Sequence, residues 1–286
     1  MAVQLFFIEY RYYKGCLVEG FTMLINKVSA NRGAAWINES IGLLKTGGMA
    51  VWLPALLVGF LGSLPYLGGL LGILMIFFYG GLVLTFNQPN GHHNALSGFT
   101  EGRFARLFPL LALNILLGVI ALIAVWPMLQ PIYEAALQGT KLGEEQALGL
   151  MLSFGKQLLW LIPASIFISW IIQFAVPLVS ITGLTGSKAI LQALSAIKIN
   201  WAALLVNIIC VVVVVIIISI IIMLPMMLIS AALASSPIIM NIAIMPFTTV
   251  LTAVMVALMS GNMLFAYRDV FGDTEVPTMK DTELLI

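Results

Sequence analysis

The sequence predicts an all-α protein: a polytopic membrane bundle of about six transmembrane helices with short amphipathic helices at the membrane interface. Of its 286 residues, 61% are hydrophobic and only 9% are charged, and the mean hydropathy is +1.09. A soluble domain has roughly 25% charged residues with which to cover its surface. Because so few charges cannot cover a soluble fold of this size, the excess apolar surface is expected to face lipid.

Four long runs without Asp, Glu, Lys or Arg predict where the chain crosses the membrane. Residues 46–100, 107–133, 157–187 and 199–267 are free of charge, over 55, 27, 31 and 69 residues. A helix needs ~20 residues to cross a hydrocarbon core ~30 Å thick. The two shorter runs each suit one pass and the two longer runs each suit two. The sequence therefore predicts a six-pass domain over residues 23–271.

Turn residues divide each of the two longest runs. Gly, Ser and Pro occur at 62–66 in the first run, and two Ser and a Pro occur at 234–237 in the second. The β-branched run at 211–218 would suit a buried strand in water, but an open strand in lipid leaves backbone groups unpaired, so a helix is predicted there as well. The four resulting passes cover residues 51–61, 67–86, 201–233 and 238–267.

Basic residues predict that both ends of the chain lie in the cytoplasm. With the N-terminus inside, eleven of the thirteen Lys and Arg residues fall in cytoplasmic segments, and only Lys141 and Lys156 fall on the opposite side. Cytoplasmic segments of membrane proteins carry an excess of Lys and Arg. The weak net charge of +1 gives no reason to expect a nucleic-acid partner.

The two ends of the chain differ in composition from the six-pass domain. Residues 1–22 mix tyrosines and charges with apolar residues and have no signal-peptide pattern. We expect Met23 to be the true start and residues 1–22 to be a non-native extension. Residues 272–286 are acidic and polar, and we expect them to form a cytoplasmic tail.

Three amphipathic segments precede the predicted passes. Residues 34–46 and 187–200 each place apolar side chains on one helical face, and residues 95–107 do so less regularly because Arg103 interrupts the face. Such segments lie in the membrane interface. Each segment is followed by apolar sequence, which suggests a unit of one interfacial helix and two passes that occurs three times. The pattern leaves open whether this is an internal repeat.

Two groups of residues are candidates for contacts in the membrane. Aromatic and arginine side chains near the predicted interfaces suit the lipid headgroup level. These interfacial candidates are Trp36, Arg103, Arg106, Tyr267 and Arg268. Neutral polar side chains at membrane depth are expected to hydrogen bond between helices, because unpaired amides are costly in lipid. These intramembrane candidates are Asn114, Gln173, Asn207 and Asn241.

No set of residues predicts a catalytic, metal or cofactor site. The first aspartate is Asp269, and no serine has the context of a hydrolase nucleophile. His92 and His93 are the only histidines, and two adjacent imidazoles do not comfortably share one ion. Cys16 and Cys210 are too far apart in sequence to indicate a disulfide framework. A membrane-embedded enzyme using His92 or His93 is the least favoured hypothesis.

Three short motifs resemble an uncharacterised family of proteobacterial inner-membrane proteins, which is distantly similar to the membrane domain of some glycerophosphodiester phosphodiesterases. The motifs are Arg32-Gly33-x-x-Trp36, Leu64-Pro65-x-Leu67-Gly68 and Tyr267-Arg268-Asp269-Val270-Phe271. The resemblance covers roughly residues 23–271, but residues 45–48 depart from the basic, proline-containing turn expected there. It implies a bacterial inner-membrane location and an all-helical fold. The phosphodiesterase domain lies outside the resemblance, so its activity is not implied.

Together these observations predict a non-enzymatic multi-pass membrane protein, a scaffold or accessory factor that binds membrane lipids, another membrane protein or a second copy of itself. The alternative is a permease or channel for a neutral or amphiphilic solute. That alternative would use the intramembrane amides and the passes interrupted by prolines such as Pro127, Pro163 and Pro225.

Overall fold

The computed structural model describes residues 23–64, 67–87, 104–139, 143–233 and 235–272. These residues are 90% helical and contain no strand, which confirms the all-α prediction. The expected extension at 1–22, the acidic tail after Gly272, His92, His93 and Arg103 lie outside the described residues. The helices are α1 (Arg32–Thr46), α2 (Gly48–Ser63), α3 (Leu67–Asn87), α5 (Phe104–Gln138), α6 (Glu144–Thr182), α7 (Gly186–Ala232) and α8 (Pro237–Phe271).

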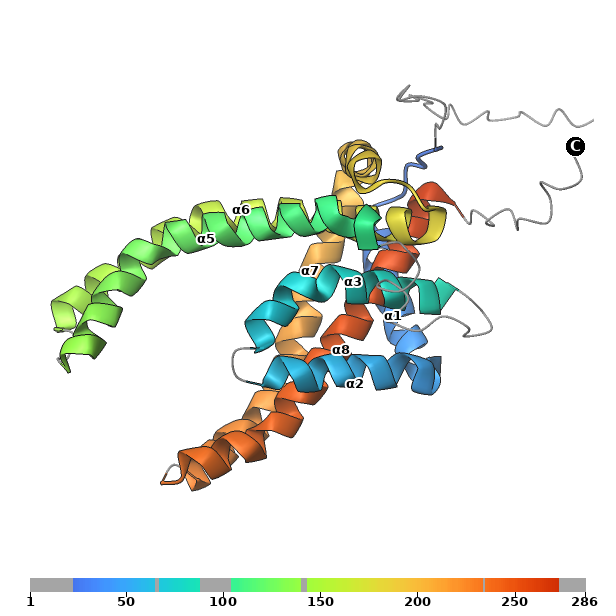
Figure 1. The fold of residues 1–286 in the computed structure, drawn as a ribbon. Helices are drawn as coiled ribbons and strands as arrows, with labels where there is room; N and C mark the ends of the chain where they lie inside the picture. Colours follow the sequence, from blue (N-terminus) through green and yellow to red (C-terminus); the bar gives the residue numbers. More distant parts are fainter. Residues whose placement is uncertain (1–22, 65–66, 88–103, 140–142, 234, 273–286) are drawn as a thin grey trace, which may run out of the picture.

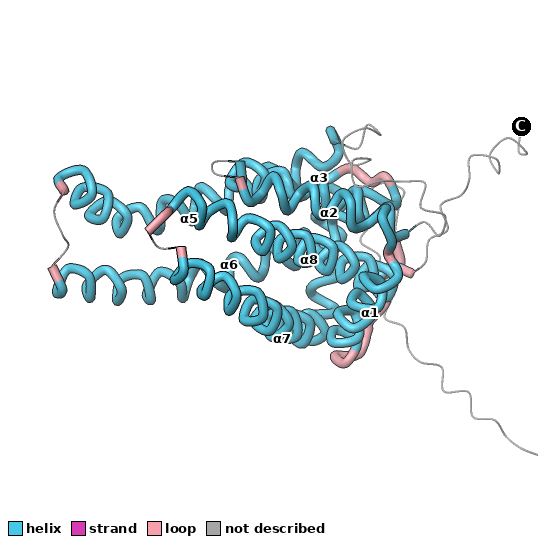
Figure 2. The backbone as a smooth tube through the Cα atoms, turned by 90° about the horizontal axis from the view of Figure 1, so that it is seen from below, coloured by secondary structure: helices cyan, strands magenta, loops and turns pink. Residues whose placement is uncertain are grey.

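Three helical hairpins meet at one end of the molecule, which we call the base (Figure 1). The base contains α1, the start of α2, the ends of α3, α6 and α8 and the starts of α5 and α7. From it the α5–α6 arm and the α7–α8 arm extend and splay apart, while the shorter α2–α3 hairpin packs against α8. Figure 2 shows the same arrangement from below, with the far tips of both arms on the side away from the base.

Four helices are long and apolar enough to cross a membrane. They contain the spans Ala105–Pro127, Gly155–Thr182, Gly186–Ala232 and Ile239–Phe271. Helices α1 and α2 make a fifth only if they are counted as one span bent by 101°. The fold is therefore compatible with a multi-pass membrane protein, but the described helices amount to four or five spans and not to the six expected.

The shortfall comes from the 55-residue run. Helices α2 and α3 lie where the passes 51–61 and 67–86 were expected, but neither counts as a full span by itself. Helix α1 extends to Thr46 and the chain then turns sharply, so α2 has only 16 residues. Gly48 at this turn has φ +56°, a backbone conformation that favours glycine. The indole of Trp52 donates a hydrogen bond across the turn to the carbonyl oxygen of Leu44, at 3.2 Å. The apolar helix recognised in α3, Leu71–Asn87, is also shorter than a full span.

The amphipathic segment predicted at 187–200 corresponds to the first part of α7. The helix bends at Asn200, whose φ of −114° and ψ of 20° are not helical. Before the bend, the small side chains of Ala189, Ala193 and Ala196 are buried, and this spacing of three and four residues places them on one face. The predicted boundary between the interfacial segment and the following pass, at residues 200 and 201, thus coincides with a bend in the backbone of α7.

The apolar core lies in the base. Phe174 of α6 contacts Phe271 of α8 edge to face with ring centroids 5.8 Å apart, and Tyr267 stacks on Phe271 at 5.6 Å. Trp36 of α1 and Leu204 of α7 are also fully buried in this core. Such aromatic pairs contribute roughly 0.5–1.5 kcal/mol beyond the burial of their area. The base is therefore the packed part of the molecule.

Two glycines allow helices to cross with their backbones in contact. A Cβ atom at Gly33 of α1 would overlap the carbonyl oxygen of Ala203 on α7. One at Gly59 of α2 would overlap the carbonyl oxygen of Thr249 on α8. Small residues have this role at helix interfaces inside membranes, where close backbone approach provides the packing.

The close backbone contact at Gly33 predicts how a substitution there changes the stability of the protein. Gly33→Ala is expected to lower the free energy of unfolding by about 1–3 kcal/mol, because the added methyl group overpacks a backbone contact. The measurement is the thermal unfolding midpoint of the purified protein in detergent. Gly42→Ala is the matched control, since a Cβ at Gly42 on the same helix would meet nothing within 4 Å. Equal midpoints for the two variants would contradict the packing described here.

Candidate functional site

A network of side-chain amides lies at the centre of the base, around Asn207 of α7. Its Nδ2 donates to the carbonyl oxygen of Gly33 at 2.9 Å and to Oδ1 of Asn262 at 2.8 Å. Its Oδ1 accepts from Nδ2 of Asn262 at 3.1 Å and from Nε2 of Gln173 at 3.3 Å. An asparagine side chain has two donor hydrogens and two acceptor positions, so Asn207 uses its full capacity. The network joins α1, α6, α7 and α8.

Burial makes this network important for stability. Asn207 is 2% exposed and Asn262 is 3% exposed, and Gln173 is also buried. A buried amide without partners costs roughly 1–3 kcal/mol in proteins. Because Asn207 and Asn262 form a reciprocal pair, each satisfies both a donor and an acceptor of the other. The arrangement of four helices that supplies every partner is therefore strongly preferred over one that supplies fewer.

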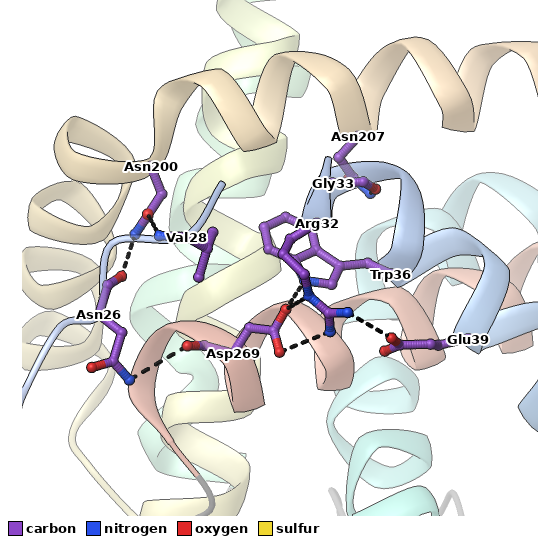
Figure 3. Close-up of polar contacts among 9 residues, drawn as sticks. All are labelled: Asn26, Val28, Arg32, Gly33, Trp36, Glu39, Asn200, Asn207 and Asp269. Atoms are coloured by element: carbon purple, nitrogen blue, oxygen red, sulfur yellow. Dashed lines mark hydrogen bonds and ion pairs between the residues drawn. The ribbon is translucent and has the colours of Figure 1, made fainter. Parts of the chain in front are cut away.

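A charged cluster lies beside the amides, where α1 meets the end of α8 (Figure 3). The guanidinium of Arg32 donates to both carboxylate oxygens of Asp269, from Nε at 2.5 Å and from Nη2 at 2.9 Å. Its Nη1 contacts the carboxylate of Glu39 at 3.0 Å. The indole nitrogen of Trp36 donates to Oδ2 of Asp269 at 2.7 Å. A bidentate pair of this kind fixes both distance and orientation.

The electrostatics of the cluster favour a structural role. Hydrogen bonding to Asp269 raises the pKa of Arg32, and the charges of Asp269 and Glu39 add to this, while partial burial opposes it. The arginine therefore stays charged. One guanidinium faces two carboxylates, which leaves the cluster with a formal charge of −1 and no attraction for an anion such as a lipid phosphate.

An extended segment before α1 lies across the bend in α7 (Figure 3). Oδ1 of Asn200 accepts from the backbone N–H of Val28 at 2.8 Å, and its Nδ2 donates to the carbonyl oxygen of Asn26 at 3.0 Å. The backbone N–H of Asn26 donates to the carbonyl oxygen of Val270 at 2.7 Å. The segment thus joins the bend of α7 to the end of α8.

The four described interfacial candidates have protein partners in the structure. Trp36 and Tyr267 are 0% and 1% exposed, so both rings are covered by the base. Arg106 is exposed and donates to the carbonyl oxygen of Gly183 at 2.7 Å, next to the end of α6. Arg268 donates to Oδ1 of Asn87 at 3.1 Å. Each of the two arginines thus joins two helices of the base.

The intramembrane candidates separate into two groups. Gln173 and Asn207 are brought together in the amide network, although they are 34 residues apart in sequence. Asn114 is half-buried on α5 and Asn241 is exposed near the far end of α8. The structure therefore does not unite the four amides in one site.

Several residues of the base did not stand out in the sequence, chiefly Glu39, Asn200, Asn262 and Asp269. A usable signal was present. Asn200 and Asn207 are seven residues apart on α7, and Asn262 and Asp269 are seven apart on α8, so each pair lies on one helical face. Polar residues that repeat every two turns in an otherwise apolar helix indicate a polar seam between helices.

A shallow apolar groove of about 270 Å³ runs between α1 and α7 and is open to the outside. Ile37 and Ile41 of α1 face Ile209 and Val213 of α7 across it, and Cys210, which is free, also lines it. Within the described residues, no group of three or more His, Cys, Asp and Glu side chains is placed to hold a metal ion. The polar groups described above are engaged in joining helices.

Comparison with known proteins found no match: no family model, no curated protein and no solved structure is similar to this chain. The resemblance to a proteobacterial inner-membrane family therefore stays a prediction.

The amide network predicts that replacement of Asn207 by an apolar residue destabilises the protein. Asn207→Leu is expected to lower the free energy of unfolding by about 1–3 kcal/mol, because it removes the hydrogen-bonding partner of the buried amides of Asn262 and Gln173. The measurement is unfolding in detergent by heat or denaturant. The control is Asn241→Leu, at an exposed position, which should change stability little.

A double variant tests whether the side chains of Asn207 and Asn262 stabilise the protein as a hydrogen-bonded pair. Asn207→Leu with Asn262→Leu should cost less than the sum of the single variants, since removing both partners leaves fewer unpaired groups. Strictly additive losses would show that the two amides are not coupled.

Proposed function

We propose that this chain is a multi-pass protein of the bacterial inner membrane that acts as a non-enzymatic scaffold or accessory factor, binding lipid or a protein partner. The observation that carries the proposal is the contrast between the base and the two arms. The polar side chains of the base are engaged with one another, while the arms present long apolar surfaces that the chain itself does not cover. Such surfaces are available for lipid or for another apolar partner.

The degree of exposure supports a lipid environment. Of the 18 most apolar consecutive residues in the span Ala105–Pro127, only 11% are buried. The fraction is also 11% for the corresponding residues of α7. Exposed side chains there include Ile123, Ile217 and Leu228. Soluble monomers rarely expose contiguous apolar patches larger than a few hundred Å². Hydrocarbon removes this cost, because lipid tails are as apolar as the side chains that they contact.

The positions of the charges support an orientation with the base toward the cytoplasm. Lys27, Lys45, Lys198, Arg106 and Arg268 all belong to segments of the base. If each of the three hairpins leaves the base and returns to it, the chain crosses six times and both ends lie on the cytoplasmic side. The excess of basic residues there agrees with the positive-inside rule.

The alternative function is a permease or channel for a neutral or amphiphilic solute. Prolines inside the spans favour it, since Pro127, Pro163, Pro225 and Pro246 loosen their helices and leave backbone carbonyls without their usual partners. Against it, Asn207 uses all of its side-chain hydrogen-bonding groups on other helices, one of them on Gln173, which leaves it no capacity for a solute. The scaffold is therefore preferred.

The orientation can be tested by labelling single cysteines in intact cells with a membrane-impermeant maleimide, in a Cys16→Ser, Cys210→Ser background. We expect Glu134→Cys, near the tip of the α5–α6 arm, to react in intact cells because it lies outside. Thr185→Cys, in the turn of the base between α6 and α7, should react only after the membrane is permeabilised. The opposite pattern would reverse the topology, and labelling of both sites in intact cells would refute a membrane-spanning α6.

The scaffold is distinguished from the permease by two measurements on the same purified protein. In mild detergent, we expect phospholipid or a membrane protein to co-purify with it, because its arms bind apolar partners. In liposomes of defined lipid, we expect no protein-dependent movement of a broad panel of neutral solutes. A lipid-free, partner-free monomer would count against the scaffold, and saturable flux of any solute would favour the permease.

A further inference from the structure

The far part of the α5–α6 arm carries exposed aromatic side chains. Trp126 and Tyr133 on α5 are exposed, and Trp160 on α6 is 83% exposed, an unusual degree for a tryptophan. Trp and Tyr are enriched at the boundary between hydrocarbon and water, where the ring contacts lipid and the N–H or O–H group contacts headgroups and water. These rings are therefore candidates for a membrane-interface belt.

The two tryptophans lie at the same distance from the base. Trp126 is about 22 residues from the start of α5 at Phe104, and Trp160 is about 22 residues from the end of α6 at Thr182. At about 1.5 Å per residue, each lies about 33 Å along its helix from the base. This length matches a hydrocarbon core ~30 Å thick. With the base at one interface, both tryptophans reach the other.

Helix α5 continues past this level and becomes amphipathic. Leu129, Tyr133 and Leu137 are exposed and follow Trp126 at spacings of three and four residues, so they form one apolar stripe. Beside the stripe, Nε2 of Gln130 donates to the carboxylate of Glu134 at 2.9 Å. An apolar stripe with a polar flank suits a helix that lies on a membrane surface.

Helix α6 shows the same pattern on its side of the arm. Leu152 and Leu159 are exposed and are seven residues apart, with the exposed Lys156 between them on the same face. Lys156 also lies four residues from Trp160. A lysine in this position can lay its carbon chain along apolar surface and reach a lipid phosphate with its ammonium group.

Prolines occur where the arm passes this level. Pro127 and Pro131 in α5 and Pro163 in α6 lie within five residues of the two tryptophans. Prolines bend helices because they remove a backbone hydrogen bond. Figure 1 shows that the arm curves along its length, so that its tip does not continue in the direction of the part next to the base.

We infer that the outer part of the α5–α6 arm, residues 129–137 and 152–159, leaves the hydrocarbon and binds the headgroup layer of the leaflet opposite the base. Trp126, Trp160 and Lys156 anchor it there. The inference rests on the proposed membrane-spanning role, and it names phospholipid headgroups as the partner of this surface. The far part of the α7–α8 arm lacks these anchors, because residues 202–266 contain no Trp, no Tyr and no charged residue.

The test is depth-dependent fluorescence quenching in liposomes of phosphatidylethanolamine and phosphatidylglycerol. In the Cys16→Ser, Cys210→Ser background, a small environment-sensitive probe is attached to Leu137→Cys or Leu152→Cys. Both positions are exposed, so folding should be preserved. The quenchers are lipids with a nitroxide on the headgroup, lipids with a nitroxide in mid-chain, and aqueous iodide. Ile120→Cys, exposed within the α5 span, reports insertion of the arm.

We expect the Leu137 and Leu152 probes to be quenched at least twofold more by headgroup nitroxide than by mid-chain nitroxide, and the Ile120 probe to show the reverse. Quenching of both tip probes by iodide alone would overturn the inference, since the tip would stand in water. Insensitivity to all three quenchers would also overturn it, because protein would then cover the tip. An Ile120 probe that mid-chain nitroxide does not quench would refute the membrane-spanning proposal itself.

Discussion

One asparagine side chain, Asn207, joins four helices of this fold. Its amide reaches a backbone carbonyl of α1, a glutamine of α6 and an asparagine of α8, and no donor or acceptor of Asn207 is left unused. In an apolar surrounding, each such bond competes with an unpaired group and not with water. These hydrogen bonds therefore favour one arrangement of the four helices in the base, and the apolar core is packed in the same arrangement.

The rest of the base extends this interaction. Asp269, which pairs with Arg32, lies seven residues after Asn262 on the same face of α8. Asn200 lies seven residues before Asn207 on the same face of α7. Each of the two helices therefore carries a row of two polar residues. The extended segment around Asn26 connects the ends of the two rows. As a result, α1, which is short and half polar, is held by charges and amides as well as by its buried tryptophan.

The two arms differ from the base, because apolar side chains and not polar contacts dominate them. Many of their apolar side chains face outward, and in α5, α7 and α8 only 11%, 11% and 22% of the most apolar residues are buried. A protein stabilised in water would turn these residues inward, whereas a protein in lipid needs polar groups inward and apolar groups outward. The molecule thus has a base held by specific polar contacts and arms whose surface is suited to contact with hydrocarbon.

The sequence by itself determined the helical class, the apolar character of the long runs and several boundaries, including the end of the amphipathic segment at Asn200. These properties depend on local composition and on helical periodicity, which can be read along the chain. It could not show that Gln173 and Asn207 meet while Asn114 and Asn241 remain apart, since all four are amides in similar apolar surroundings. Only the tertiary structure decided this, and likewise the pairing of Arg32 with Asp269 and the burial of Trp36 and Tyr267. The physical reason is that hydrogen bonds and ion pairs are made across helices, so their partners depend on how the helices cross.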